Sequence, residues 1–224
     1  DCPMAHMITA DRIAEVRAEY EDLAVVCYVN STAEIKAVSD VCVTSSNAVK
    51  VVSNIPQKNI FFVPDNNLGR YVAEKLPEKH FIFHDGFCHV HKSIHAAELQ
   101  AAKDACPEAL VLTHPECTAD VVAMSDFVGS TSEIIDFATQ SDCKKFIICT
   151  EMGVFFELQQ KNPDKKFYSV GHRQFCPNMK KVTIDKVEQV LEKLGSGELE
   201  EITLSDEILT RAAKPLQRML ELAK

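Results

Sequence analysis

Short apolar runs alternate along the chain with segments in which apolar residues recur at helical spacing. Strands are predicted where the runs are apolar at nearly every position, over residues 23–28, 41–43, 60–63, 109–112, 127–128 and 146–149. Helices are predicted where the spacing lengthens, over residues 8–20, 48–53, 94–105 and 133–139. Near-continuous apolar strands between helices are typical of parallel sheets covered on both faces. The pattern therefore predicts an α/β protein with short parallel sheets in three-layer domains.

The same order of elements occurs twice, at an offset of 86 residues. Residues 24–34 align without a gap with residues 110–120. In each copy a short helix is expected to begin near Thr32 or Thr118, because both can cap a helix and both precede acidic residues. A repeat of this length is too long for a solenoid unit. We therefore interpret the two copies as pseudo-symmetric α/β domains.

Polar residues follow the predicted strands in both copies. In open parallel sheets, ligands bind beyond the carboxyl ends of the strands. The residues at these ends are Tyr28, Asn30, Thr44, Ser45, Pro64 and Asp65 in the first copy and His114, Glu116, Ser130, Thr131, Thr150 and Glu151 in the second. Two such ends built by one repeat predict domains that meet face to face around a central active site.

Charge narrows the classes of function. The 224 residues carry 24 Lys and Arg against 33 Asp and Glu, a net charge of -9 without long blocks of either sign. A nucleic-acid surface needs a clustered basic face, whereas a small anionic substrate needs only a local positive or amide-lined pocket. The apolar runs are far too short to span a membrane. We therefore expect a cytoplasmic protein that acts on small molecules and binds neither nucleic acid nor membrane.

The chain contains nine cysteines, a high count. Their odd number argues against a disulfide framework, and the absence of any CxxC pair argues against zinc ribbons and thioredoxin-like sites. Cys27, Cys42 and Cys149 lie in apolar runs, so we interpret them as small buried hydrophobic residues.

Three other cysteines occupy related positions in the repeat. Cys2 falls on Cys88 at the common offset, and Cys176 follows Cys88 by 88 residues. Equivalent positions in symmetric domains converge on an axis, so we interpret the three as ligands of one iron–sulfur cluster with one iron left open. An open iron can polarise an oxygen or nitrogen of a substrate as a Lewis acid. The alternative is three incidental buried thiols.

Several residues at the strand ends have acid–base chemistry. His114 and Glu116 lie two apart and on one face, where they can act as acid and base, although such a pair can also simply pack. Tyr28 and Asn30 hold the matching positions in the first copy and are interpreted as hydrogen-bonding substrate ligands. His91, three residues after a predicted cluster cysteine, is equally compatible with substrate contact and with packing.

Hydroxyl-rich loops join a short strand to a helix in both copies, at residues 43–47 and 129–132. Hydroxyls and free amides at a helix N-terminus can bind phosphate or a carboxylate, although such residues also serve as plain N-caps. Their recurrence at the repeat offset favours anion binding by Ser45, Ser130 and Thr131. No GxGxxG or P-loop pattern occurs, so nucleotide-binding folds of those kinds are not supported.

Eight short motifs carry a family resemblance. They are Cys2-Pro3-Met4-Ala5, Tyr28-Val29-Asn30-Ser31, Val43-Thr44-Ser45-Ser46-Asn47, Pro64-Asp65-Asn66-Asn67-Leu68-Gly69, Cys88-His89-Val90-His91, His114-Pro115-Glu116-Cys117, Gly129-Ser130-Thr131-Ser132 and Cys176-Pro177-Asn178-Met179. As a set and in this order, they resemble the motifs of the iron–sulfur-dependent (A-type) quinolinate synthase family. The resemblance runs over the full chain.

The resemblance implies three pseudo-symmetric α/β domains around a 4Fe–4S cluster held by Cys2, Cys88 and Cys176. It implies a transferase of NAD biosynthesis that condenses iminoaspartate with dihydroxyacetone phosphate to quinolinate, releasing phosphate and water, with the open iron assisting dehydration. L-Aspartate oxidase would supply the iminoaspartate. By motif, the catalytic residues would be Tyr28, His114 and Glu116, and the substrate-binding residues Asn30, Ser45, His91, Ser130 and Thr131.

We predict domains over residues 1–86 and 87–172, followed by a C-terminal segment over residues 173–224 that carries Cys176 and a helix over residues 206–224. Members of the family have a further α/β domain before the first cluster cysteine. The resemblance implies that the C-terminal helix packs on that domain, which would add a Tyr and a His to the pocket. We therefore expect this polypeptide alone to be inactive or poorly active.

Three other functions stay open on the residues alone. Another open-iron hydro-lyase would share the three-cysteine arrangement but would not need two anion loops. A non-enzymatic iron–sulfur sensor would tolerate the substitution of Glu116. A metal-free phosphate-binding protein would contain no iron.

Overall fold

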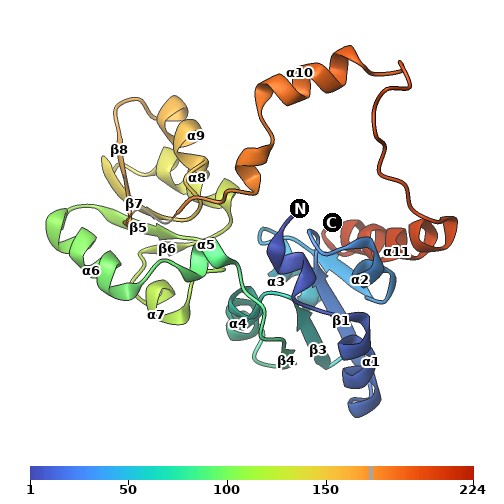
Figure 1. The fold of residues 1–224 in the computed structure, drawn as a ribbon. Coiled ribbons are helices and arrows are strands. Elements are labelled where there is room, and N and C mark those ends of the chain that lie inside the picture. Colours follow the sequence, from blue (N-terminus) through green and yellow to red (C-terminus); the bar gives the residue numbers. More distant parts are fainter. Residues whose placement is uncertain (172–173) are drawn as a thin grey trace.

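The computed structural model, which describes residues 1–171 and 174–224, contains two four-stranded sheets with every strand pair parallel (Figure 1). Their strand orders are β2-β1-β3-β4 and β6-β5-β7-β8, so the second sheet repeats the topology of the first. This confirms the predicted α/β class and the predicted parallel sheets.

The first sheet comes from the first copy of the repeat. Its strands are β1 (Leu23–Tyr28), β2 (Val41–Val43), β3 (Asn59–Val63) and β4 (His80–Phe83). The helical elements around it are η1 (Pro3–His6), α1 (Ala10–Glu19), α2 (Ala33–Ala37), α3 (Ala48–Ser53) and α4 (Asn66–Lys75). In the centre of the sheet, Val26 lies opposite Val41 on one side and Phe62 on the other.

The second sheet uses the second copy. Its strands are β5 (Leu110–Thr113), β6 (Phe127–Val128), β7 (Lys145–Cys149) and β8 (Lys166–Ser169). Its helices are α5 (His89–Lys92), α6 (Ala96–Ala105), α7 (Ala119–Val122), α8 (Thr131–Gln140) and α9 (Val154–Lys161). As predicted, Thr32 caps α2, accepting a hydrogen bond from the Ile35 amide, and Thr118 occupies the N-cap position of α7.

Each sheet is buried on both faces, because alternate side chains of its central strands point into two separate cores. On one face of the first sheet, Val25 packs in a cluster with Ile13 of α1; on the other, Val26 packs with Val51 of α3. The second sheet is covered in the same way, by α6 and α7 on one face and α8 and α9 on the other. Both units are therefore three-layer α/β structures.

The fourth strand of each sheet was not predicted from the sequence. β4 and β8 lie at the sheet edges and are only partly buried, so they lack the continuous apolar run that marks the inner strands. The short helix α5 was also missed, since its residues His89, Val90, His91 and Lys92 show no helical apolar period.

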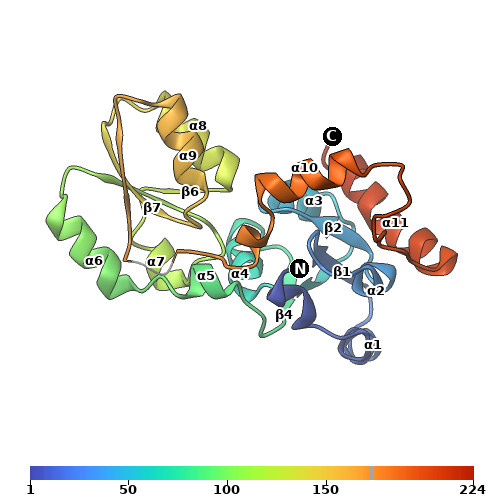
Figure 2. The same ribbon diagram turned by 45° about the horizontal axis from the view of Figure 1, so that its top comes forward.

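The C-terminal segment forms η2 (Met179–Lys181), α10 (Ile184–Glu192) and α11 (Asp206–Leu222). The helix α11 packs on the helix α2 and the edge strand β2. The helix α10 projects away from both sheets at the top of Figure 1 and comes to the front in Figure 2. The expected packing of α11 on a further domain stays a prediction. The predicted domain limits also stay predictions, and the one between residues 172 and 173 lies outside the described residues.

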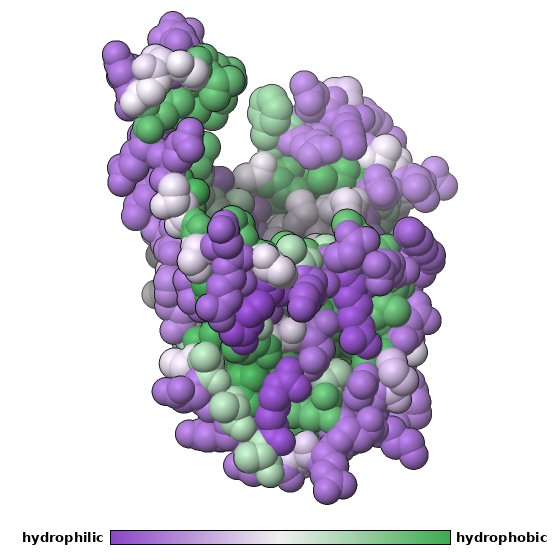
Figure 3. Space-filling model, turned by 90° about the vertical axis from the view of Figure 1, so that its right-hand side faces the viewer, coloured by the Kyte–Doolittle hydropathy of each residue, from purple (hydrophilic) through white to green (hydrophobic). Residues whose placement is uncertain are grey.

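The projecting segment exposes apolar side chains. On α10, Ile184, Val187, Val190 and Leu191 are 79%, 42%, 49% and 64% exposed. The space-filling view shows hydrophobic surface on the part of the molecule that projects at the top (Figure 3). None of the described helices is long and apolar enough to cross a membrane.

Candidate functional site

The carboxyl-terminal ends of the two sheets are joined by hydrogen bonds between the repeats. The side-chain amide of Asn67, in α4, donates to the backbone carbonyl of Glu116 at 3.0 Å. The hydroxyl of Tyr71, also in α4, donates to the backbone carbonyl of Val128 at 3.5 Å. The hydroxyl of Tyr28, at the end of β1, lies near Ser45 and the carboxylate of Glu116, which both influence its pKa. These contacts bring the polar strand ends of the two repeats together.

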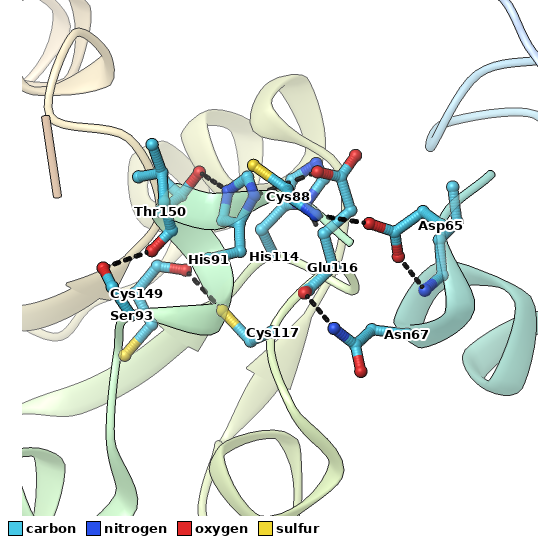
Figure 4. A network of polar contacts seen from close by, with 12 residues as sticks. Asp65, Asn67, Cys88, His91, Ser93, His114, Glu116, Cys117, Cys149 and Thr150 are labelled. Atoms are coloured by element: carbon cyan, nitrogen blue, oxygen red, sulfur yellow. Dashed lines mark hydrogen bonds and ion pairs between the residues drawn. The ribbon is translucent and has the colours of Figure 1, made fainter. Parts of the chain in front are cut away.

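A buried network surrounds Glu116 (Figure 4). Its Oε2 accepts a hydrogen bond from Nδ1 of His91 at 3.0 Å, and Nε2 of His91 lies 3.0 Å from Oγ1 of Thr150. The rings of His91 and His114 stack with centroids 4.5 Å apart and 13° between their planes. The predicted acid–base residues and His91 therefore lie in one cluster.

The two histidines have opposite protonation preferences. Burial alone would lower the pKa of His91, but hydrogen bonds to Cys88 and Glu116 outweigh it, so the pKa is raised. Burial would raise the pKa of Glu116, but the hydrogen bond from His91 lowers it, so the two form a buried ion pair. Burial and the charge of His91 lower the pKa of His114 to about 3, which keeps that ring neutral.

The neutral ring of His114 has a defined tautomer. Its Nδ1 accepts a hydrogen bond from the backbone amide of Glu116 at 3.3 Å. The proton of the neutral ring therefore lies on Nε2. Tyr28 is also held protonated, because burial and the charge of Glu116 raise the pKa of its hydroxyl. The cluster thus offers proton donors beside a carboxylate.

Cys2 and Cys88 occupy equivalent structural positions. Each is the N-cap residue of a short helix, η1 or α5, with extended backbone angles of φ -85° and ψ 126° at Cys2 and φ -76° and ψ 118° at Cys88. Burial is the main cause of the raised pKa of Cys2, and the charges of Cys88 and Glu116 add to it. The two cysteines therefore lie close enough to interact.

Cys176 also begins a helical turn. Its carbonyl accepts a hydrogen bond from the amide of Lys180 at 3.3 Å, much as the carbonyl of Cys88 accepts one from Lys92 at 2.9 Å. All nine thiols are free. Over residues 1–171 and 174–224, no hydrogen bond joins Cys176 to Cys2 or Cys88. Ligation of one cluster by the three cysteines thus stays a prediction.

A different set of donors is already close together. The ligand atoms of Cys88, His91 and Glu116 all lie within 4.8 Å of one another, a spacing that could hold a metal ion. Sequence reasoning assigned these residues separately, to the cluster, to substrate contact and to catalysis. Only the packing of α5 against the end of β5 shows that they share one place.

The two hydroxyl-rich loops face a common pocket of about 350 Å³. Its lining includes Ser45 from the first repeat and Ser130 and Thr131 from the second, together with Ser46, Ser132, Ile135, Asp136, Glu157 and Lys161. Ser130 is also the N-cap of α8, in a reciprocal capping box with Glu133. Ser130 therefore caps a helix, as the alternative interpretation of this loop predicted, and it also lines the pocket.

Asn30 is the one predicted substrate ligand that stands apart from these groups: it lies exposed in the turn after β1.

The sequence analysis placed Asp65, Thr150 and Glu151 correctly at strand ends but gave them no function. Asp65 is fully buried, and burial, with the charge of Glu116 adding, raises its pKa to about 7. The signal that could have found Asp65 and Glu151 is their separation by the repeat offset.

Comparison with known proteins gives a consistent result. The sequence pattern of a family described as Quinolinate synthetase A protein matches residues 1–221. The chain is 48% identical to a quinolinate synthase of Caldicellulosiruptor saccharolyticus, over 99% of this chain and 72% of that protein. It is 48% identical to one of Fusobacterium nucleatum, over 100% of this chain and 73% of that protein, and 44% identical to one of Clostridioides difficile, over 100% and 72%.

Proposed function

The chain belongs to the quinolinate synthase family, and we propose that it condenses iminoaspartate with dihydroxyacetone phosphate to quinolinate, releasing phosphate and water. Family membership makes it a transferase-type enzyme of NAD biosynthesis. The choice of substrates rests on one observation: the pocket lined by Ser45, Ser130 and Thr131 lies beside the network at Glu116. The hydroxyl-lined pocket suits a phosphate group, and the network suits proton transfer. L-Aspartate oxidase would supply the iminoaspartate, in the cytoplasm.

Cys2, Cys88 and Cys176 would hold a 4Fe–4S cluster with one iron open. The donor set fits this group, because all three are free thiols and each begins a helical turn, with Cys2 and Cys88 close enough to interact. When bound, the cluster supplies a Lewis acid for a substrate oxygen or nitrogen.

The residues around Glu116 would move the protons of the reaction. The ion pair with His91 keeps Glu116 ionised despite its burial, so the carboxylate can accept a proton. His114 offers the proton on Nε2, and Tyr28 offers its hydroxyl proton. Because the site is buried, these groups act on a substrate that is largely shielded from water.

The hydroxyl-lined pocket would bind the phosphate of the second substrate. Ser45 and Thr131 approach it from different repeats, so a phosphate there also bridges the two domains. Lys161 is the cation in the lining, and its Nζ lies 2.8 Å from a carboxylate oxygen of Glu157. An incoming phosphate competes with Glu157 for that charge.

A single metal ion held by Cys88, His91 and Glu116 is the competing candidate, favoured by the mutual distances of their ligand atoms. It would occupy the lone pairs that the proposed mechanism needs on Glu116. Iron and sulfide analysis separates the two: a cluster contains equal amounts of both, and a single ion contains no sulfide.

The experiment that tests the proposed function is an anaerobic assay of the purified protein with dihydroxyacetone phosphate and iminoaspartate generated from aspartate. Because the family resemblance predicts that this polypeptide alone is poorly active, we expect a low yield, with quinolinate and inorganic phosphate in equal amounts. Neither product should form when dihydroxyacetone phosphate is omitted. A protein that dehydrates a hydroxy acid but makes no quinolinate would instead support the hydro-lyase alternative.

A further inference from the structure

Two buried carboxylates outside the predicted site occupy equivalent positions in the repeat. Asp65 follows β3 and Glu151 follows β7, and they are 0% and 9% exposed. Neither is needed as an acid or base in the proposed reaction. Burying a carboxylate is unfavourable unless hydrogen bonds compensate for the lost water, so each must have specific partners.

Both carboxylates use their two oxygens in the same way. Oδ1 of Asp65 accepts from the Leu68 amide, in the helix that follows, at 2.7 Å, and Oδ2 accepts from the backbone amide of Cys88 at 2.9 Å (Figure 4). One oxygen of Glu151 accepts from the amide of Gly153 at 2.6 Å, and the other from the amide of Cys176 at 3.2 Å. Each carboxylate thus ties a predicted cluster cysteine to the end of a sheet.

A backbone hydrogen bond two residues before each cysteine completes the arrangement. The amide of Asn66 donates to the carbonyl of Gly86 at 2.8 Å, and the amide of Met152 donates to the carbonyl of Gln174 at 2.7 Å. At Gly86 two segments of the chain approach so closely that an added Cβ would lie 2.3 Å from the carbonyl oxygen of Pro64.

Both pairs of contacts form although the segments between carboxylate and cysteine differ in length. Asp65 and Cys88 are 23 residues apart, whereas Glu151 and Cys176 are 25 apart. The longer acidic side chain, that of Glu151, occurs with the longer segment. The same pair of contacts is therefore made twice by different lengths of chain, which argues that the contact to the cysteine amide is the feature that both repeats retain.

We propose that Asp65 and Glu151 are positioning residues that fix the backbone of Cys88 and Cys176 and so orient their thiolates toward the iron–sulfur cluster. The inference rests on the proposed function, since it assumes that these cysteines are ligands. A carboxylate has two oxygens that accept hydrogen bonds, so one side chain can hold the amide of the following helix and the cysteine amide at once. The bond to the cysteine amide fixes the cysteine backbone before the cluster binds, so less conformational entropy is lost when the cluster binds.

The test compares Asp65→Asn and Glu151→Gln with Asp126→Asn. An amide leaves one acceptor for two backbone donors, so either the helix amide or the cysteine amide loses its partner. Asp126 is the matched control, because its Oδ2 accepts from the Val111 amide at 2.7 Å without involving a cysteine. Lys180→Met is the second control: it removes the ion pair of Glu151 and leaves the bond to Cys176.

The measurement is the rate at which anaerobically purified protein releases iron to a chelator, with the melting temperature of the iron-free protein as the structural readout. We expect release about tenfold faster in Asp65→Asn and Glu151→Gln, and an unchanged rate in Asp126→Asn and Lys180→Met. The melting temperature of the iron-free protein should fall no further in Asp65→Asn than in Asp126→Asn.

Two results would count against the inference in distinguishable ways. Iron release from Asp65→Asn and Glu151→Gln at the rate of Asp126→Asn would overturn the positioning role and leave the proposed function intact. An unsubstituted protein that holds no iron after anaerobic purification and reconstitution would overturn the cluster, and this inference with it. Faster hydrogen exchange at the Cys88 amide in iron-free Asp65→Asn is the local change that the inference requires.

Discussion

His91 and His114 stack face to face, with ring centroids 4.5 Å apart, yet one is held charged and the other neutral. Both rings are buried, and burial lowers the pKa of each. At His91 the hydrogen bonds to Cys88 and to the Glu116 carboxylate outweigh burial, whereas Nδ1 of His114 accepts from the backbone amide of Glu116. Because the charge on His91 also lowers the pKa of His114, the pair cannot share the same state. The carboxylate of Glu116 thus helps to keep one of two buried, stacked histidines charged, while burial keeps the other neutral.

Substitution of Glu116 by Gln tests the acid–base function. The amide keeps the shape but cannot accept a proton, so we expect kcat for quinolinate formation to fall by about 10²- to 10⁴-fold. Glu188→Gln, at an exposed position on α10, is the control and should leave kcat unchanged. Full activity in Glu116→Gln would contradict the acid–base function of Glu116.

Removal of the imidazole of His91 tests the buried ion pair. His91→Leu leaves the carboxylate of Glu116 buried without its partner, so we expect the iron-free protein to lose about 3 kcal/mol of unfolding free energy. Lys144→Met removes an exposed ion pair with Asp164 and should cause no measurable loss. Equal urea midpoints for the two variants would contradict the buried pair.

Substitution of Thr131 by Ala tests phosphate binding in the pocket between the repeats. We expect KM for dihydroxyacetone phosphate to rise about tenfold with little change in kcat, because a hydrogen bond to a charged group is lost. Thr183→Ala removes the N-cap of α10, away from the pocket, and serves as the control. An unchanged KM would show that the phosphate binds elsewhere.

Substitution of Gly86 by Ala tests the close approach beside Cys88. The new Cβ would lie 2.3 Å from a backbone oxygen, so the chain must shift, at a cost of about 2 kcal/mol of unfolding free energy. Gly195→Ala meets no atom within 4 Å and has only its positive φ against it, so we expect a smaller loss of about 1 kcal/mol. Thermal unfolding that ranks them in the reverse order would contradict the packing at residue 86.

The repeat and the inner strands were predictable because apolar continuity is a direct consequence of burial on both faces. The predicted strand at residues 23–28 and the predicted helix at residues 48–53 have the observed limits. The edge strands β4 and β8 were not predictable in this way, since partial exposure removes the apolar signal.

The site was only partly predictable, for a different reason. Tyr28, His114 and Glu116 were placed correctly because strand ends follow from the strands. The bond between His91 and Glu116 joins residues 25 apart, and the bond between Asp65 and the Cys88 amide joins residues 23 apart. Such contacts depend on how α5 packs against the sheet ends, which no local pattern in the sequence reports.

The most direct test of the account is iron and sulfide analysis of anaerobically purified protein with single Cys→Ser substitutions at residues 2, 88 and 176. We predict about four iron atoms and four sulfides in the unsubstituted protein, sharp losses of both in each variant, and normal content in the control Cys143→Ser. About one iron atom without sulfide in the unsubstituted protein, unchanged in Cys2→Ser and Cys176→Ser and lost in Cys88→Ser and Glu116→Gln, would contradict it. That outcome would place a single metal ion at Cys88, His91 and Glu116 instead.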